Sequence, residues 1–174
     1  MSVLAQKNIL IGISGGIAAY KVPYLIRLLT KVKSNVKVVM TPSSKEFVTP
    51  LTLSTVSEND VFSEFITKKN NNPSWNNHVK LAEWADIFII APATSNTISS
   101  MANARCDNLL LACYLSSNCP VFVAPAMDLE MFKNNLNQVN IKKLKDNLTD
   151  VLPVGSGSLA SGLEGEGRML EPNE

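Results

Sequence analysis

Four short, nearly continuous apolar segments are the feature of this sequence that most constrains its fold. They cover residues 8–14, 36–41, 86–91 and 119–124, and a shorter apolar segment follows at 151–154. Apolar runs of this length are typical of strands that are buried on both faces. Strands that alternate with helices pair in parallel through right-handed crossovers. The sequence therefore predicts an α/β domain of three layers around an open, doubly wound parallel sheet.

The segments between these strands predict helices and loops. A short helical stretch follows a turn at 42–47, and longer helices are predicted over residues 17–32, 50–61, 78–84, 96–115 and 134–147. Residues 68–74 predict a polar, mobile loop. The stretch 155–169 has too many glycines for regular structure, and we interpret it as an unstructured terminus or a lid. A chain of 174 residues without linker or repeat predicts one domain over 1–174.

Charge and cysteine patterns disfavour several classes of protein. Sixteen Lys and Arg residues balance fifteen Asp and Glu residues, and no basic cluster is present, which argues against binding to nucleic acid. Three cysteines without a CxxC pair, together with a single histidine, predict reduced core thiols and no metal site. No segment resembles a signal peptide or reaches the roughly 20 apolar residues that span a bilayer, so we expect a cytoplasmic protein without a membrane partner.

Small polar residues gather where the predicted strands end, which is the edge at which doubly wound sheets bind ligands. Residues 12–16, 41–44, 92–97 and 125–128 fall there and are rich in glycine, hydroxyl and amide groups. Glycine lets the backbone approach an anion, so the first loop is a candidate phosphate site. A tight turn or a helix cap explains each loop taken alone, and the lack of GxGxxG disfavours a nicotinamide cofactor. Several such loops at one edge favour a bound cofactor.

Two further residues are candidates for proton transfer or substrate contact. His78 is the single histidine, and its side-chain type titrates near neutrality, which makes it the leading acid or base if the protein is an enzyme. A lone histidine at a helix start is more often a solvent-facing residue. Asp128 follows a strand end, where its carboxylate would meet a substrate or cap the next helix.

Six motifs occur in order along the whole chain. They are residues 14–21 (SGGIAAYK), 78–86 (HVKLAEWAD), 92–97 (PATSNT), 106–110 (CDNLL), 125–132 (PAMDLEMF) and 165–172 (GEGRMLEP). Through these motifs the chain resembles the flavin-dependent cysteine decarboxylase family. The resemblance is specific because all six motifs occur in the family's order, and it points to the branch that acts on 4'-phosphopantothenoylcysteine in coenzyme A biosynthesis.

This resemblance implies a flavodoxin- or Rossmann-like subunit that binds FMN and has a C-terminal lid over about 155–172. It implies a homo-oligomer, a trimer or a dodecamer of stacked trimers, with the flavin at a subunit contact. His78 would be the active-site histidine, and Asp128 would face the carboxylate and amide region of the substrate. The residues implied to line FMN are Ser14, Gly15, Gly16, Thr41, Ser43, Thr94, Ser95, Asn96, Thr97 and Ala126.

The implied reaction needs a flavin because direct decarboxylation of a C-terminal cysteine leaves an unstabilised carbanion. In the family, the thiol is first oxidised to a thioaldehyde, and CO2 is then lost. The resulting ene-thiolate is reduced and protonated to 4'-phosphopantetheine, so no external reductant is consumed. The protein supplies orientation and proton control.

Two positions depart from the family pattern. Asp128 replaces the asparagine of the Pro-x-Met-Asn segment, which exchanges an amide donor for a carboxylate, and we interpret Asp128 as protonated or as facing a substrate amide. Ser161 replaces the lid cysteine that donates the last proton, and a hydroxyl is a far weaker acid than a thiol. An engineered change, a lineage with another donor and an enzyme that stops at the ene-thiol all explain Ser161. The accompanying change at Asp128 favours the lineage.

Several alternatives stay open at this stage. A peptide-cysteine decarboxylase usually lacks the full Gly-Arg-Met lid, and a flavin prenyltransferase lacks the Pro-Ala-Met-Asx segment, so both fit less well. A flavin-binding regulatory subunit without full turnover is kept open by the missing lid cysteine. The resemblance also implies a phosphopantothenate–cysteine ligase, fused or separate, so the chain is either a stand-alone decarboxylase or part of a longer bifunctional protein.

Overall fold

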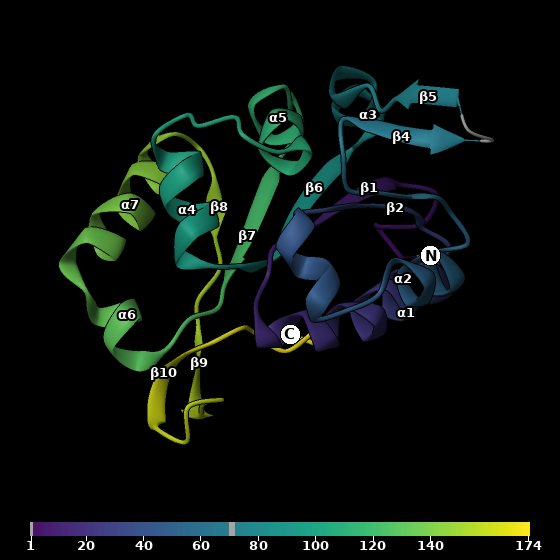
Figure 1. The fold of residues 1–174 in the computed structure, drawn as a ribbon. Coiled ribbons are helices and arrows are strands. Elements are labelled where there is room, and N and C mark those ends of the chain that lie inside the picture. Colours follow the sequence, from purple (N-terminus) through teal and green to yellow (C-terminus); the bar gives the residue numbers. More distant parts are fainter. Residues whose placement is uncertain (1, 70–71) are drawn as a thin grey trace.

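A computed structural model describes residues 2–69 and 72–174, and it contains one central parallel sheet. The strand order is β3-β2-β1-β6-β7-β8, so the chain starts in the middle of the sheet and winds outward in both directions (Figure 1). This confirms the doubly wound α/β fold. The six strands are β1 (Asn8–Ile13), β2 (Asn35–Met40), β3 (Val61–Phe62), β6 (Ile87–Ala93), β7 (Val121–Pro125) and β8 (Asp150–Val151).

Helices cover both faces of the sheet and form three layers. One face packs against the 3-10 helix η1 (Ile17–Lys21), α1 (Val22–Lys31) and α2 (Pro50–Ser57), through Ile9, Ile11 and Ile13 of β1. The other face packs through Leu10, Phe88 and Ile90. The helices on that face are α3 (His78–Trp84), α4 (Ser95–Ala102), α5 (Leu109–Leu115) and α7 (Asn135–Asp146). Neighbouring residues of β1 therefore serve opposite cores, as the pleat of a strand requires.

The prediction of one long helix over 96–115 is wrong. The chain leaves helical geometry after α4, where Ala104 adopts a left-handed backbone with φ of 52°. The side chain of Asn108 then accepts a hydrogen bond from the Leu111 amide and starts α5 as a new helix. An N-cap of this kind is a strong local start signal.

The predicted helix over 50–61 is also too long. It ends at Ser57, because Glu58 takes a left-handed conformation with φ of 56°. The following residues, Val61 and Phe62, join β2 as the edge strand β3. The short helical stretch predicted after residue 42 is a 3-10 helix, η2 (Pro42–Glu46).

Two segments that we predicted as irregular form hairpins. Part of the loop predicted over 68–74 belongs to β4 (Ile66–Lys69) and β5 (Asn72–Trp75), which pair antiparallel, while Asn70 and Asn71 lie outside the described residues. The glycine-rich stretch forms β9 (Gly155–Ser158) and β10 (Glu164–Arg168). Both hairpins stand apart from the main sheet (Figure 1). Within the described chain, no helix is long and apolar enough to cross a bilayer.

The three cysteines are free, and only Cys113 is buried, whereas Cys106 is exposed. The prediction of core thiols therefore holds for Cys113 and is wrong for Cys106. Burial raises the pKa of the Cys113 thiol to about 12, with a smaller contribution from Cys106. Cys113 is thus a packing residue of α5 rather than a reactive thiol.

Candidate functional site

The hydroxyl of Ser14 joins the first and third strand-end loops. Its Oγ donates to the carbonyl of Pro92 at 2.6 Å and accepts from the amide of Thr94 at 3.0 Å. Ser14 is 1% exposed, so water does not compete for these bonds. The hydroxyl group thus donates one hydrogen bond and accepts another within the protein. Ser14 therefore positions the two loops, and a ligand would be bound by their other groups.

The glycines of the first loop lie against side chains from the second and third loops. A Cβ placed on Gly15 would stand 2.6 Å from the Ser43 hydroxyl, and one on Gly16 would stand 3.2 Å from the Thr94 methyl group. A side chain at position 15 would collide with Ser43, so only glycine fits there. Ser43 also exchanges a hydrogen bond with Thr41 at 3.2 Å. It does not cap a helix, because no side-chain cap starts η2.

This cradle fits a phosphate-bearing cofactor. Among the described residues, the amides of Gly15 and Gly16 donate to no protein acceptor, and they precede η1. Free amides beside small hydroxyl side chains are the groups that bind phosphate oxygens. The three loops therefore offer donors without placing a carboxylate in the cradle.

The third loop has a different role for each of its residues. Thr94 caps α4 by accepting from the Thr97 amide, as predicted, and its hydroxyl also lies 3.3 Å from the Thr97 hydroxyl. Thr97 is buried, whereas Asn96 is exposed. Ser95 donates to Asn137 of α7 at 2.6 Å. The loop is thus held from one side by Ser14 and from the other side by α7.

A cavity of about 400 Å³ adjoins this cradle at Gly16. It lies between η1, the segment that follows β7, and the β9–β10 hairpin. Ala126 and Asp128, both predicted from the sequence, line it. Three other lining residues, Tyr20, Lys21 and Arg168, were not predicted from the sequence. Lys21 and Arg168 lie within the motifs at 14–21 and 165–172. Two positively charged residues at one edge of the sheet were the signal by which the sequence could have predicted them.

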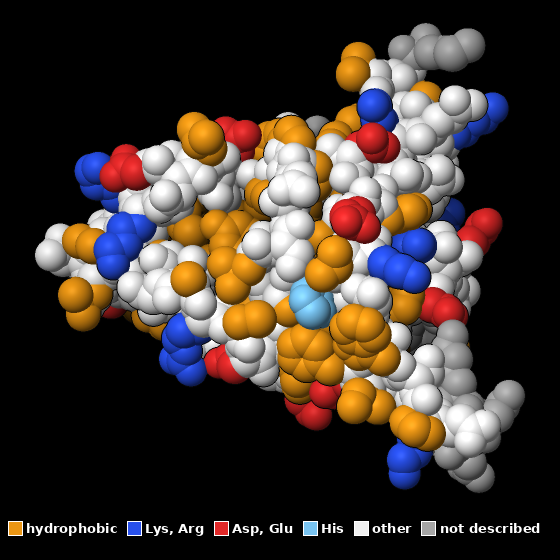
Figure 2. All heavy atoms as spheres, turned by 90° about the horizontal axis from the view of Figure 1, so that it is seen from above, with side chains coloured by type: hydrophobic (Ala, Val, Ile, Leu, Met, Phe, Trp, Pro, Cys, Tyr) orange, Lys and Arg blue, Asp and Glu red, His pale blue; other side chains and the backbone are white. Residues whose placement is uncertain are grey.

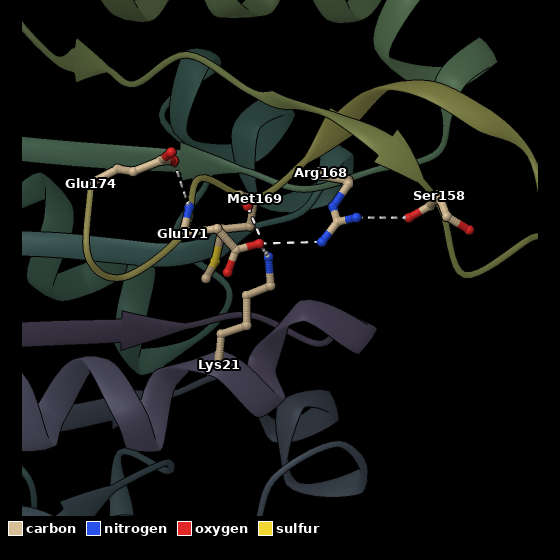
Figure 3. Close-up of polar contacts among 6 residues, drawn as sticks. All are labelled: Lys21, Ser158, Arg168, Met169, Glu171 and Glu174. Atoms are coloured by element: carbon tan, nitrogen blue, oxygen red, sulfur yellow. Dashed lines mark hydrogen bonds and ion pairs between the residues drawn. The ribbon is translucent and has the colours of Figure 1, made fainter.

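Lys21 ties the C-terminal segment to η1 (Figure 3). Its ammonium group donates to the Met169 carbonyl at 3.0 Å and to Glu171 at 2.6 Å, although the lysine is only 7% exposed. Arg168 donates to the same Glu171 oxygen at 3.2 Å and to the Ser158 carbonyl at 3.4 Å. The hydrogen bond from Lys21 lowers the pKa of the Glu171 carboxyl, and the charges of Lys21 and Arg168 act in the same direction.

Asp128 caps the short helix α6 (Leu129–Lys133). Its Oδ1 accepts from the Leu129 amide at 2.7 Å, so the capping alternative from the sequence applies. The carboxylate is also part of the cavity wall, and its second oxygen carries no bond to a described residue. Asp128 can therefore cap α6 and still accept a hydrogen bond from a ligand.

His78 lies apart from this cavity. Its ring packs edge-on against Phe65 and Trp75, with centroids 6.1 and 6.2 Å away, and its Nδ1 is buried without a hydrogen-bond partner among the described residues. The histidine is half-buried, which is less open than the solvent-facing position expected for a lone histidine. Figure 2 shows it surrounded by hydrophobic side chains on one face. Figure 1 shows α3 at the top and the β9–β10 hairpin at the bottom.

Ser161 lies in the turn between β9 and β10. It is exposed, and its Oγ accepts from the Leu163 amide at 3.4 Å. Among the described residues, its neighbour Ala160 lines the cavity and Ser161 does not. Residues of the β9–β10 hairpin line one side of the cavity, and the role of the hairpin as a lid stays a prediction. The roles of His78, Asp128 and Ser161 remain predictions.

A doubly wound parallel sheet with a phosphate-type cradle and an adjoining cavity defines a cofactor- or nucleotide-binding class of protein. The family model described as Flavoprotein matches residues 2–174, and this chain belongs to that family. The chain is 42% identical over 171 residues to the coenzyme A biosynthesis bifunctional protein CoaBC of Haemophilus influenzae, covering 98% of this chain and 42% of the relative. It is 50% identical over 127 residues, 73% of this chain and 35% of the relative, to a cysteine/cysteine sulfinic acid decarboxylase of an unknown prokaryotic organism.

A solved structure with the same fold is a cysteine-to-serine mutant of PPC decarboxylase complexed with pantothenoylaminoethenethiol. It is 32% identical, with a TM-score of 0.83, and the alignment covers 97% of this chain and 93% of that chain. Other structural neighbours are described as an FMN-dependent cysteine decarboxylase and an FMN-binding protein. The chain spans about two fifths of the length of the curated CoaBC relatives it matches.

Proposed function

We propose that this chain binds FMN and decarboxylates 4'-phosphopantothenoylcysteine to 4'-phosphopantetheine. The observation that carries the proposal is the convergence of three glycine- and hydroxyl-rich loops on one edge of the sheet, next to a cavity of about 400 Å³. Membership of the Flavoprotein family and the similarity to CoaBC proteins support the choice of cofactor and substrate.

In this proposal the loops hold the cofactor's phosphate. The free amides of Gly15 and Gly16 donate to phosphate oxygens, and the hydroxyls of Thr41 and Ser43 add donors from the second loop. The third loop contributes Thr94, Thr97 and Asn96 to cofactor binding. Ser14 and Ser95 fix the position of this loop. Bound FMN supplies the reversible two-electron chemistry that oxidises the cysteine thiol and later reduces the product.

The cavity holds the substrate beside the cofactor. The second oxygen of Asp128 accepts the amide N–H of the substrate, because a carboxylate there would repel the substrate's own carboxylate. The β9–β10 hairpin covers the cavity and excludes water. Excluding water protects a reactive thioaldehyde from side reactions.

His78 reaches the reaction from a second copy of the chain. His78 begins α3, which lies at the opposite end of Figure 1 from the β9–β10 hairpin, and Figure 2 shows the histidine among hydrophobic side chains, where Trp75 is 61% exposed. A buried Nδ1 without partner is costly unless an assembly supplies one. We therefore propose a homo-oligomer, a trimer or dodecamer in the cytoplasm, in which His78 of one copy faces the cavity of its neighbour. A ligase, fused or separate, supplies the substrate.

A second candidate substrate is free cysteine or cysteine sulfinic acid. It is favoured by the 50% identity to a decarboxylase with that description. The two candidates differ in size, because 4'-phosphopantothenoylcysteine adds a long phosphorylated arm to the same reacting end. A cavity of about 400 Å³ is far larger than cysteine needs, which favours the larger substrate.

The decisive experiment combines a cofactor measurement with a substrate comparison. We expect the purified chain to contain FMN at near one-to-one ratio by absorption and mass, and to release CO2 from 4'-phosphopantothenoylcysteine. Equal amounts of cysteine, cysteine sulfinic acid and a C-terminal cysteine peptide are the competing substrates. A colourless chain that takes up no FMN contradicts the proposal. A flavin-loaded chain without turnover on any of the four supports the regulatory alternative instead.

A further inference from the structure

Asn137 connects the third strand-end loop to the segment that carries Asp128. It lies in the first turn of α7 and is 9% exposed. Its Oδ1 accepts from the Ser95 hydroxyl at 2.6 Å, and its Nδ2 donates to the Met131 carbonyl at 2.7 Å. One side chain therefore contacts the start of α4 and the end of α6.

The orientation of this amide is fixed by its partners. The Met131 carbonyl can only accept, so it must face the NH2 group, and the carbonyl oxygen of Asn137 is left to face Ser95. A carboxylate at position 137 has no donor for the Met131 carbonyl, and a hydrocarbon makes neither hydrogen bond. Ser95 keeps its lone pairs free to accept from a ligand while it donates to Asn137.

The two ends of the bridge are anchored close to both halves of the candidate site. Ser95 directly follows Thr94, whose amide is held by Ser14. Met131 lies one helical turn after Asp128, the residue that caps α6 and lines the cavity. Asn137 thus provides a side-chain link between the third loop and the segment that carries Asp128, in addition to the backbone hydrogen bond from the Ala126 amide to the Ala93 carbonyl.

We propose that Asn137 is a positioning residue that fixes the cofactor loop relative to the substrate segment. This inference rests on the proposed function. The reacting carbon of the substrate must lie in contact with the flavin for the oxidation to occur, and small misplacements of reacting groups reduce rates steeply. Asn137 touches neither ligand, and it acts by holding α4 and α6 at one separation.

Gln138 provides a matched control. It is the next residue of α7, and its side-chain amide donates to the Phe132 carbonyl at the end of α6. It is exposed and makes no bond to the third loop. Gln138→Ala therefore removes a similar cap from the same helix without breaking the bridge.

The test compares Asn137→Ala, Asn137→Asp and Gln138→Ala in the full chain. FMN affinity is measured by quenching of flavin fluorescence, and KM and kcat are measured at saturating FMN. We expect Asn137→Ala to weaken FMN binding about tenfold and to raise KM at least about threefold, because a buried bridge between two sites is lost. Asn137→Asp keeps the oxygen that accepts from Ser95, so FMN affinity should not change. It also places a carboxylate oxygen against the Met131 carbonyl, so KM should still rise. Gln138→Ala should change neither quantity beyond about twofold.

Either of two outcomes overturns the inference. One is a lower melting temperature in Asn137→Ala with FMN affinity and KM unchanged, which indicates a purely structural residue. The other is an effect of Gln138→Ala equal to that of Asn137→Ala. If Asn137→Ala does not fold, the KM of Asn137→Asp decides. Failure of the wild-type chain to bind FMN contradicts the proposed function itself, so the two failures are distinguishable.

Discussion

Single residues at the cavity edge determine which proton donors are available. Ser161 stands where the resembled family has a cysteine, but its hydroxyl lies in an exposed turn and contacts the Leu163 amide. Tyr20 and Asp128 line the cavity, whereas Ser161 does not. This geometry is consistent with a proton donor other than the residue at position 161, and the lineage explanation for Ser161 stays a prediction.

We expect Ser161→Cys to leave the rate of 4'-phosphopantetheine release within about twofold of the unchanged chain, because a thiol in an exposed turn is no nearer to the cavity than the hydroxyl. Product should be quantified by mass, together with any ene-thiol that accumulates. A tenfold faster release, with loss of an accumulated ene-thiol, would show that the natural serine stalls the reaction. Ser156→Cys, at an exposed residue of β9 that does not line the cavity, controls for the effect of adding a thiol to the hairpin.

At the scale of elements, a glycine residue allows the β9–β10 hairpin to pack closely against the segment that follows β7. A Cβ on Gly167 would lie 2.3 Å from the Met127 carbonyl, and its φ is +133°. The Gly167 carbonyl also accepts from the Met127 amide at 3.0 Å. Gly162, in the turn, has φ of +86° but no atom within 4 Å of its Cβ position. Both glycines thus adopt a positive φ that would strain a residue with a side chain, and only Gly167 is in close contact with another segment.

This difference predicts separate effects for two alanine substitutions. Gly167→Ala pushes the hairpin away from the segment that holds Asp128, so we expect KM for 4'-phosphopantothenoylcysteine to rise about tenfold. Gly162→Ala adds backbone strain alone and should change KM by about twofold or less. FMN affinity should stay unchanged in both, because the cradle lies outside the hairpin. Steady-state kinetics and fluorescence titration measure the two quantities, and equal KM values in the two variants would contradict the docking role of Gly167.

The C-terminal segment after β10 should loosen in acid. Lys21 and Arg168 lower the pKa of Glu171 from its ordinary 4.5. A carboxyl with a lowered pKa stabilises the folded chain above pH 4.5, and that contribution disappears as the pH falls through the folded-state pKa. We expect Glu171→Gln to lower the melting temperature at pH 7 and to converge with the unchanged chain as the pH falls from 4.5 through the lowered pKa of Glu171. Glu166→Gln, at an exposed residue of the same hairpin, is the matched control for removing a carboxylate.

The main strands were predictable because each is a short apolar run between helical segments. Element ends were less predictable, since they depend on single residues such as Asn108 and Glu58, whose cap and left-handed backbone interrupt a continuous helical pattern. The hairpin at 155–168 was missed because its glycines adopt conformations that composition alone assigns to disorder. The strand-end loops were found from the sequence, whereas Lys21 and Asn137 were not. Their roles come from contacts with residues far away in the chain.

At the scale of the whole molecule, the candidate site is divided between two faces. The cavity with Asp128 lies by the β9–β10 hairpin, whereas His78 is the first residue of α3, and Figure 1 shows α3 at the opposite end of the molecule from that hairpin. We therefore propose that one chain does not bring His78 to its own cavity. Two copies can, because the hydrophobic face around His78 is open for contact (Figure 2).

Mixing two inactive variants tests this division. His78→Asn lacks the histidine and Asp128→Ala lacks the carboxylate, so each alone should lose at least about 100-fold in turnover. When the two variants are co-expressed and assemble at random into a ring, an intact His78 faces an intact Asp128 at about one contact in four. About a quarter of the full activity should therefore return. Size-exclusion chromatography with light scattering reports the mass of the mixed oligomer. If mixed oligomers of the expected mass do not regain turnover, both residues serve the same chain. A protein that is active as a monomer would contradict the shared site directly.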